Sequence, residues 1–209
     1  MFAGIIASME IDILSDETDS YYEEQFVGLI ITGEWIRSKE FEDCRFESCR
    51  FTECNFFECA FLECRFEDCL MSATQVSGCS FIDAQFTECK LVGIDWTQGS
   101  NVRGLVFSKC TLDYSVFSPL KLKGLKLLNC VCKEADFREA DLTDGNFEGT
   151  DFDRSVFSQT NLTNANFEEA RNYSIDPRVN VLKRAKFSMP EAMSLLKSFD
   201  VTIVNSKVV

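Results

Sequence analysis

The eleven cysteines of this 209-residue chain are its most reactive side chains, but their spacing argues against most catalytic and metal-binding roles. Zinc ribbons need two cysteines separated by two residues, and the chain has no such pair; Cys130 and Cys132 stand too close together. The absence of histidine excludes a Cys–His dyad and a Ser–His–Asp triad. Six of the cysteines recur every five residues, at Cys44, Cys49, Cys54, Cys59, Cys64 and Cys69. We interpret them as reduced thiols that act as small buried apolar residues.

The 34 acidic and 21 basic side chains give a formal charge of -13, which argues against a binder of nucleic-acid phosphates. The chain lacks a glycine-rich phosphate loop and a recognisable pair of carboxylates in a pocket, so we expect no enzyme, no cofactor and no metal. It also lacks a basic region before its short apolar N-terminus and a long apolar run. The expectation is therefore a cytoplasmic protein without membrane contact.

An apolar residue stands at every fifth position over most of the chain. The series runs from Phe26 to Trp96, and resumes from Val102 to Phe167 after one extra residue within 97–101. Two residues before most of these centres stands Cys, Ala, Ser, Thr or Gly. A period of five fits neither a helix nor a flat strand. If the centre and the small residue both face inward, each unit takes one extended step and one corner, and repetition builds a solenoid with a filled axis.

The repeats support a family resemblance. The sequences 135–139, 140–144 and 165–169 resemble the A(D/N)LXX motif of pentapeptide-repeat proteins, and the motif covers about residues 26–171. The resemblance implies an all-β, right-handed quadrilateral β-helix with four repeats per coil. Residues 20 apart would then stack, with one added across the extra residue. This places Cys49, Cys69, Cys89, Cys110 and Cys130 in one column, which we expect to be packing rather than a redox or metal site.

The C-terminal segment has a different pattern. We divide the chain into an N-terminal extension over 1–20, a β-helix over 21–187 and a capping and dimerisation segment over 188–209. Ser188 and Glu191 form a capping-box pattern that predicts a helix over about 189–198, followed by a strand over 200–204. The helix is apolar on more than one side, so one side could close the solenoid and the other could pair with a second copy. The alternative is a helix buried entirely as the cap of a monomer. The predicted dimer interface consists of Met189, Ala192, Met193, Leu196, Phe199, Val201 and Ile203.

This segment sharpens the resemblance. Residues 172–177 and 185–192 are similar to the C-terminus of Qnr-type quinolone-resistance proteins, and 89–97 is similar to an albicidin-resistance pentapeptide protein. That subgroup implies a dimeric acidic rod that mimics duplex DNA and binds DNA gyrase, and often topoisomerase IV. Many Qnr proteins carry long protruding loops, whereas the single extra residue here leaves room only for a bulge.

The charge is distributed unevenly along the chain. Residues 1–40 carry -7, 41–96 carry -7, 97–134 carry +4, 135–175 carry -6 and 176–209 carry +3. The predicted phosphate surrogates are Asp136, Glu139, Asp141, Asp144, Glu148, Asp151 and Asp153. Between the acidic regions lies a basic belt made of Arg103, Lys109, Lys121, Lys123, Lys126 and Lys133.

The leading hypothesis is a non-catalytic protein that protects gyrase from quinolones or natural-product poisons and inhibits supercoiling at high dose. Two alternatives remain open. The first is a dedicated self-immunity factor against an albicidin-like poison, and the second is a scaffold solenoid with a partner unrelated to DNA.

Overall fold

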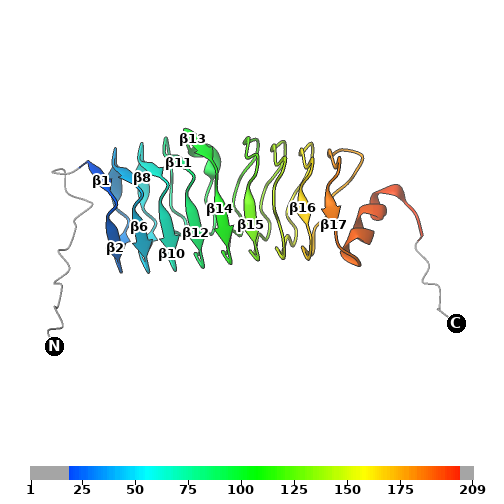
Figure 1. Ribbon diagram of the computed structural model, residues 1–209, viewed down its shortest axis with the longest axis horizontal. Coiled ribbons are helices and arrows are strands. Elements are labelled where there is room, and N and C mark those ends of the chain that lie inside the picture. The colour runs from blue at the N-terminus through cyan, green and yellow to red at the C-terminus, as the bar shows by residue number, and fades with distance from the viewer. Residues whose placement is uncertain (1–18, 203–209) are drawn as a thin grey trace, which may run out of the picture.

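Each five-residue unit forms one side of a four-sided coil. The computed structural model describes residues 19–202, and the coils stack along one axis into a straight parallel β-solenoid with a short helix at its C-terminal end (Figure 1). In a typical unit such as β5 (Glu40–Glu42), the centre Phe41 is fully buried while its two neighbours are exposed. The small residue two positions before the centre, such as Cys44 before Phe46, is buried as well. The predicted inward pair and outward neighbours are therefore confirmed.

The sides of successive coils pair into four parallel sheets, which we call faces A to D. Face A consists of β1 (Ser20–Tyr22), β5, β9 (Ala60–Leu62), β11 (Ser80–Ile82) and β13 (Asn101–Arg103). Face B begins with β2 (Gln25–Val27), β6 (Arg45–Glu47), β10 (Arg65–Glu67), β12 (Gln85–Thr87), β14 (Val106–Ser108) and β15 (Lys126–Leu128), and ends with β16 (Asn166–Phe167) and β17 (Lys186–Phe187). Face C contains β3 (Ile30–Thr32) and β7 (Arg50–Thr52), and face D contains β4 (Trp35–Arg37) and β8 (Asn55–Phe57). Elsewhere the rungs are joined by single bridges.

The register shows where the extra residue is accommodated. Partners are 20 residues apart in the first coils, as in Phe41 with Phe61, and 21 apart across the slip, as in Phe81 with Val102. The spacing returns to 20 with Phe107 and Leu127. Between these two ladders lies a single 3₁₀ turn, η1 (Trp96–Gln98). Its N-terminus is capped by Asp95, whose carboxylate accepts from Thr97 N at 3.0 Å. The slip is thus a bulge, as expected.

Stacked aromatic rings fill the axis. On face B the rings of Phe26, Phe46, Phe66 and Phe86 follow one another at centroid distances of 4.7 Å with nearly parallel planes. Rings on neighbouring faces meet edge to face, as Phe41 and Phe46 do at 5.3 Å. Both geometries are favourable for aromatic pairs and add to the free energy of burial. One continuous core therefore runs the length of the solenoid.

The cysteines contribute hydrogen bonds as well as packing. Each thiol in the first coils donates to the carbonyl of a centre 23 residues earlier, as Cys44 Sγ does to Tyr21 O at 3.4 Å. Thr74 Oγ1 and Thr160 Oγ1 make the same bond to Phe51 O and Phe137 O, each at 2.9 Å. All eleven cysteines are free and buried. Burial raises the pKa of Cys54 and Cys132 and keeps these thiols protonated, and Cys54 Sγ donates to Ile31 O at 3.3 Å. Within residues 19–202, Cys, Asp and Glu form no cluster of three that could hold a metal ion.

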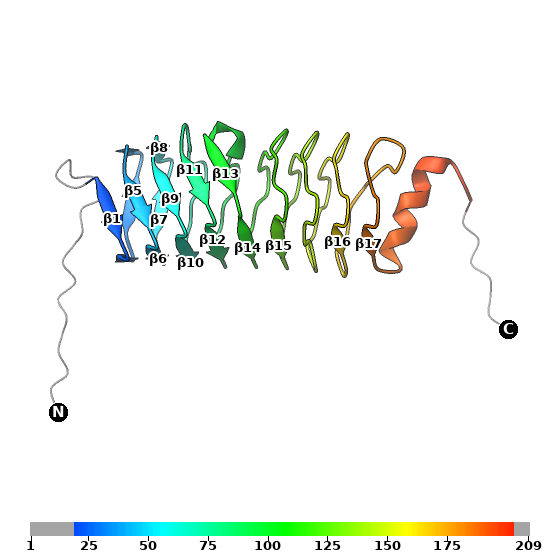
Figure 2. The same ribbon diagram turned by 45° about the horizontal axis from the view of Figure 1, so that its top comes forward.

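The C-terminal helix differs from the sequence expectation. It is a 3₁₀ helix, η2 (Glu191–Phe199), which packs across the end of the solenoid (Figure 2). The predicted capping box is wrong, because η2 has no side-chain cap and Ser188 Oγ instead accepts from Glu169 N of the preceding coil at 3.1 Å. Val201 and Thr202 are not in a strand, and the rest of the predicted strand, including Ile203, lies outside the described residues. None of the helices within 19–202 is long and apolar enough to cross a membrane.

Candidate functional site

The corner residues of the coils have an unusual backbone conformation. The residue two positions after most centres has a positive φ, for example 53° at Glu23, 47° at Asp43, 53° at Glu63 and 54° at Asp83. Glycine adopts this left-handed region without steric cost, whereas a residue with a Cβ pays for it. Many of these corners are nevertheless acidic in the first four coils: Glu23, Asp43, Glu53, Glu58, Glu63, Asp68, Asp83 and Glu88. The carboxylates are held at positions where the backbone would prefer glycine.

Four of these corner carboxylates form a column along the corner between faces A and B. Glu23, Asp43, Glu63 and Asp83 are 20 residues apart and lie on successive coils. Adjacent rungs of parallel strands are about 4.8 Å apart, so the column repeats negative charge at that interval. Further carboxylates flank it on both faces. We call this surface the acidic edge; it consists of Glu23, Glu40, Glu42, Asp43, Glu47, Glu63, Glu67 and Asp83.

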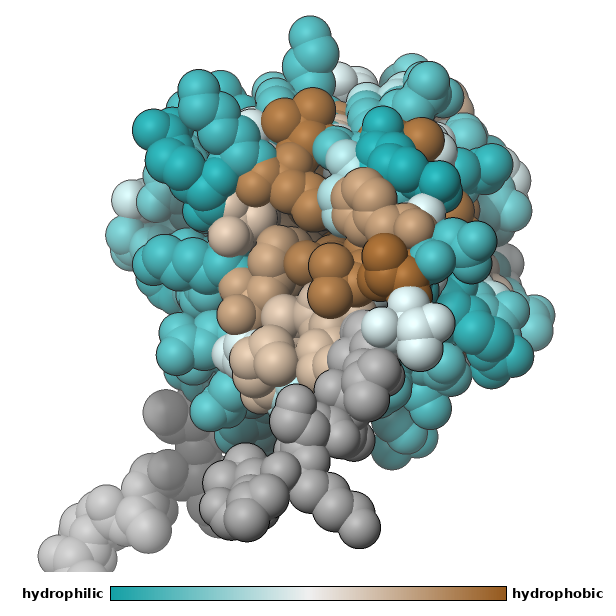
Figure 3. Space-filling model, turned by 90° about the vertical axis from the view of Figure 1, so that its right-hand side faces the viewer, coloured by the Kyte–Doolittle hydropathy of each residue, from teal (hydrophilic) through white to brown (hydrophobic). Residues whose placement is uncertain are grey.

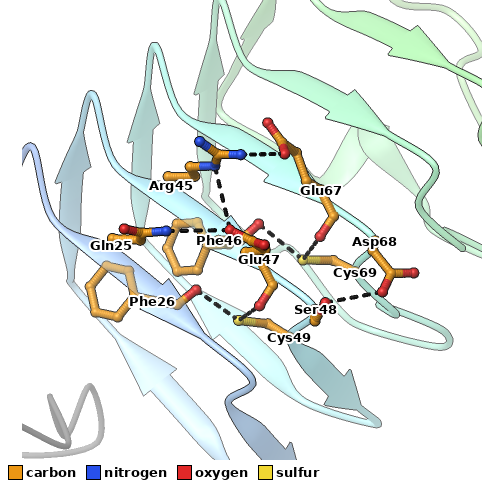
Figure 4. A network of polar contacts seen from close by, with 10 residues as sticks. All are labelled: Gln25, Phe26, Arg45, Phe46, Glu47, Ser48, Cys49, Glu67, Asp68 and Cys69. Atoms are coloured by element: carbon orange, nitrogen blue, oxygen red, sulfur yellow. Dashed lines mark hydrogen bonds and ion pairs between the residues drawn. The ribbon is translucent and has the colours of Figure 1, made fainter. Parts of the chain in front are cut away.

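A few cations within the acidic edge order its side chains. Arg45 pairs with Glu67 on the next coil at 2.6 Å, and Gln25 Nε2 donates to Glu47 at 3.3 Å (Figure 4). Arg65 reaches the corner carboxylate of Asp43 at 3.2 Å. Among the described residues, Glu63 and Asp83 make no ion pair. The acidic edge therefore keeps a net negative charge after its internal pairs are formed.

The seven predicted phosphate surrogates do not lie on one surface. Asp136 is on face D, Asp151 and Asp153 are on face C, and Asp144 and Glu148 lie at the corner of faces A and B and on face B. Only Glu139, Asp141, Asp144 and Glu148 border the side that carries the acidic edge. The seven residues surround the solenoid as a ring, so a single flat partner could contact only part of them.

Several of these carboxylates have a local structural role. The carboxylates of Asp136, Asp141 and Asp151 each accept a hydrogen bond from the backbone N–H two residues later, at 3.0–3.1 Å. Asn146 makes the same contact with Glu148 N at 3.2 Å. This is the Asx-type turn that the second position of the repeat motif favours. The sequence-based assignment missed this role, although the alternation of Asp and Asn at that position was a signal for it.

The charges near the ring are also partly compensated. The Arg138 guanidinium, 2.6 Å from Asp136, lowers the pKa of that carboxyl. Hydrogen bonds from Asn164 and then Lys123 lower the pKa of Asp144, which Lys123 contacts at 3.4 Å. Asp151 pairs with Arg171 at 3.3 Å. These carboxylates are ionised at neutral pH, but their neighbours neutralise much of the ring.

The acidic edge was not among the sequence-predicted site residues. A step of 20 residues from Glu23 meets Asp43, Glu63 and Asp83, so the column could have been found once the coil length was fixed. The charge of a segment alone does not show on which face of the solenoid it lies.

An apolar surface covers the C-terminal end of the solenoid. Leu195 of η2 packs against the end of the core, as do Leu182 and Phe187 of the last coil. On the outer side Met189, Leu196, Phe199 and Val201 are 44–69% exposed, and Ala192 and Met193 are half-buried. Seen end-on, apolar side chains gather at the centre of this face and hydrophilic ones surround them (Figure 3). The structure thus brings together six of the seven predicted interface residues, and the seventh, Ile203, lies outside the described part of the chain.

A four-sided parallel solenoid with a five-residue repeat defines a class of protein. The sequence comparison agrees: residues 39–117 match the family model "Pentapeptide repeat region", and residues 120–154 and 130–169 match "Pentapeptide repeats (8 copies)". The chain belongs to the pentapeptide-repeat proteins. The comparison with curated proteins gave no match.

Solved structures with a similar fold include two trypsin-treated variants of QnrB1, a plasmid-mediated fluoroquinolone resistance protein. One has a TM-score of 0.65 and 17% identity and covers 86% of this chain and 100% of its own. The other has a TM-score of 0.57 and 18% identity, with 88% and 99% covered. HetL, a pentapeptide-repeat protein involved in heterocyst differentiation regulation from Nostoc sp., has a TM-score of 0.37 and 15% identity, with 81% and 90% covered. For the two QnrB1 variants the likeness concerns the fold alone.

Proposed function

We propose that this protein binds DNA gyrase, with topoisomerase IV as a second candidate, through its acidic edge. Occupying the DNA-binding surface of the enzyme, it would inhibit supercoiling at high dose and protect the enzyme from quinolones or natural-product poisons at lower dose. The observation that carries the proposal is the column of carboxylates at Glu23, Asp43, Glu63 and Asp83. They recur at the same corner of four successive coils, and Glu63 and Asp83 make no ion pair within residues 19–202.

The shape and charge of the solenoid support this proposal. A straight rod with negative charge repeated at about 4.8 Å along one edge is complementary to a positively charged surface that holds duplex DNA. The centres from Phe26 to Phe167 are packed on each other and fill the axis, so a partner would contact the outer faces of the solenoid. The fold of QnrB1, a fluoroquinolone resistance protein, is compatible with the same role.

We further propose that two copies associate through the apolar C-terminal face. Met189, Leu196 and Phe199 are large apolar side chains that remain exposed around η2. Contiguous apolar patches with a polar rim are typical of protein interfaces, and a two-fold axis would place the same patch on both copies. Two solenoids of about eight coils each would then form a rod of about 75–80 Å.

The direct test is binding of purified gyrase to the protein at low ionic strength, together with a supercoiling assay with and without ciprofloxacin or albicidin. We expect binding, inhibition of supercoiling at high protein concentration and reduced drug-stabilised cleavage at lower concentration. The double variant Glu63→Gln with Asp83→Asn removes two charges from the acidic edge and should weaken binding.

Glu53→Gln with Glu58→Gln is the matched control, because it removes the same charge from corners that border face D. This control should bind like the wild type. Equal binding by both double variants would assign the effect to net charge rather than to the edge. No binding by the wild type would favour the scaffold alternative.

A further inference from the structure

The acidic edge ends at a patch of opposite sign on the same side of the rod. In the fifth and sixth coils, Arg103, Lys121 and Lys123 lie on face A and Lys126 lies on face B. We call these four residues the basic patch; they are the part of the basic belt that faces this side. Residues 101–109 and 121–129, which form faces A and B here, contain no acidic residue. On faces C and D the same coils carry both signs, with Asp113, Glu134 and Asp136 beside Lys133 and Arg138.

The basic patch is only partly neutralised by its own chain. Lys123 contacts Asp144 at 3.4 Å, and Lys109 at the neighbouring corner contacts Glu88 at 2.9 Å. Arg103, Lys121 and Lys126 are exposed and make no ion pair within residues 19–202. Three cations are therefore available at the surface although carboxylates stand in the coils on both sides.

The corner between faces A and B also carries smaller residues in these two coils. The column Glu23, Asp43, Glu63 and Asp83 continues as Gly104 and Gly124 before Asp144 restores a side chain. A Cβ at Gly124 would meet no atom within 4 Å, so this corner is open to an approaching surface. The space beside Gly104 is occupied by the Asp83 carboxylate. At Gly124, cations on both faces flank an open corner, which allows close approach of a partner.

We propose that the basic patch receives an acidic patch on the same partner that the acidic edge binds. This inference rests on the proposed function and narrows it. The partner surface must therefore carry positive, then negative, then positive charge along the axis of the rod. Its negative part must be about two coils wide, or about 10 Å. Such a pattern fixes the register of the rod on its partner, because a shift along the axis would bring like charges together. A partner surface that is positive throughout, as simple DNA mimicry requires, would be repelled here.

The experiment compares two charge-reversed double variants in a gyrase-binding titration at fixed low salt. Arg103→Glu with Lys126→Glu reverses the basic patch; the β-ladder neighbours of these residues include Ile82, Val106 and Asn146, and the nearby carboxylate is that of Asp83 beside Gly104. Arg50→Glu with Lys90→Glu reverses two exposed cations on face C and makes the same change in net charge. We expect the first variant to bind about tenfold more weakly or worse, and the second to bind as tightly as the wild type or more tightly.

Tighter binding by the patch variant, or binding equal to that of the face C variant, would overturn the inference and leave the proposed function intact. If wild-type protein does not bind gyrase, the proposed function fails and this inference fails with it. A thermal melt of each variant checks folding. If the charge-reversed patch variant has a lower melting temperature, the neutral variant Arg103→Gln with Lys126→Gln is used in its place. The inference then requires that this variant bind gyrase more weakly than its control, Arg50→Gln with Lys90→Gln.

Discussion

At the residue scale, the five-residue unit separates structural positions from positions that are free to carry function. The centre and the small residue before it are committed to the core, where Cys, Ser and Thr also donate to a carbonyl of the preceding coil. The Asp or Asn before the centre caps the turn in the later coils. The corner residue after the strand has no such internal task, and there the sequence places Glu or Asp in a conformation that suits glycine. The corners are therefore where we propose that the binding residues lie.

This division predicts a trade between stability and binding at Glu63. Glu63→Gly relieves a left-handed backbone at φ 53° and should raise the free energy of unfolding by about 0.5–1 kcal/mol. The same change removes a charge from the acidic edge and should weaken gyrase binding. Ala73→Gly, at φ 54°, is the control that relieves the same strain without a loss of charge. Urea titration measures the free energy of unfolding, and a gyrase-binding titration measures the affinity. If Glu63→Gly binds gyrase as tightly as Ala73→Gly does, the charge of Glu63 has no role in binding.

A second prediction concerns acid stability near the last coil. Hydrogen bonds from the Arg178 side chain, 2.7 Å away, lower the pKa of Asp176 to about 2, and an unfolded Asp titrates near 3.9. Because the folded pKa is the lower one, the stabilisation is present above about pH 4 and is lost as the pH falls toward 2. Asp176→Asn keeps an acceptor for Arg178 N but removes this titration. We expect wild-type unfolding free energy to fall more steeply between pH 5 and pH 2 than that of the variant; parallel curves would contradict the assignment.

At the scale of elements, each coil is stabilised mainly by the coils before and after it. Phe137 is fully buried, and its ring stacks on those of Phe117 and Phe157 at 5.0 Å each. Parallel backbone ladders join the same neighbours. Such nearest-neighbour coupling is characteristic of solenoids, so a defect in one coil is felt first by the adjacent coils.

Phe137→Ala should therefore cost about 3–5 kcal/mol, because it opens a cavity in the ring column. Val156→Ala, at an outward position of face D where the side chain is 46% exposed, should change the unfolding free energy by well under 1 kcal/mol. Urea-induced unfolding followed by circular dichroism measures both. Similar midpoints for the two variants would mean that Phe137 does not belong to the core column.

The terminal helix carries its own prediction. Leu196 is 44% exposed on the outer side of η2, and Leu196→Arg places a charge in the centre of the proposed dimer contact. Burying an unpaired charge is strongly unfavourable, so the variant should be monomeric and should lose most of its effect on gyrase. Lys197→Glu on the same helix is an exposed control that should stay dimeric. Light scattering decides the matter, and a dimer of Leu196→Arg would refute the proposed interface.

At the scale of the whole molecule, the rod presents a different surface on each side. Faces A and B carry the acidic edge and the basic patch, whereas face D carries mainly neutral residues and the stacked pair of Trp35 and Arg37, with the guanidinium carbon 4.1 Å from the ring centroid. A net charge of -13 alone would not distinguish these sides. The coil length of 20 residues determines on which face each charged side chain lies.

If opposite charges meet across the interface with gyrase, binding must depend on ionic strength. We expect the dissociation constant to rise steeply between about 0.05 and 0.5 M salt, because the Debye length falls below the spacing of the charged groups. The Glu63→Gln with Asp83→Asn variant should show a shallower dependence than the wild type. A dissociation constant that does not change with salt would point to an apolar contact instead.

The amino-acid sequence by itself determined the solenoid, its buried centres, the place of the extra residue and the packing role of the thiols. These follow from a period of five, because a regular repeat forces equivalent residues into equivalent environments. The sequence also indicated the apolar C-terminal end.

Only the tertiary structure decided which outward residues share a surface and which polar groups are already engaged. It distributed the acidic residues 136–153 around four faces and aligned Glu23 with Asp83 over four coils. In the folded chain the Ser188 hydroxyl accepts from Glu169 N of the preceding coil and does not cap η2, because that N–H lies next to it. These arrangements depend on contacts between residues about 20 positions apart. The five-residue pattern of the sequence does not specify those contacts.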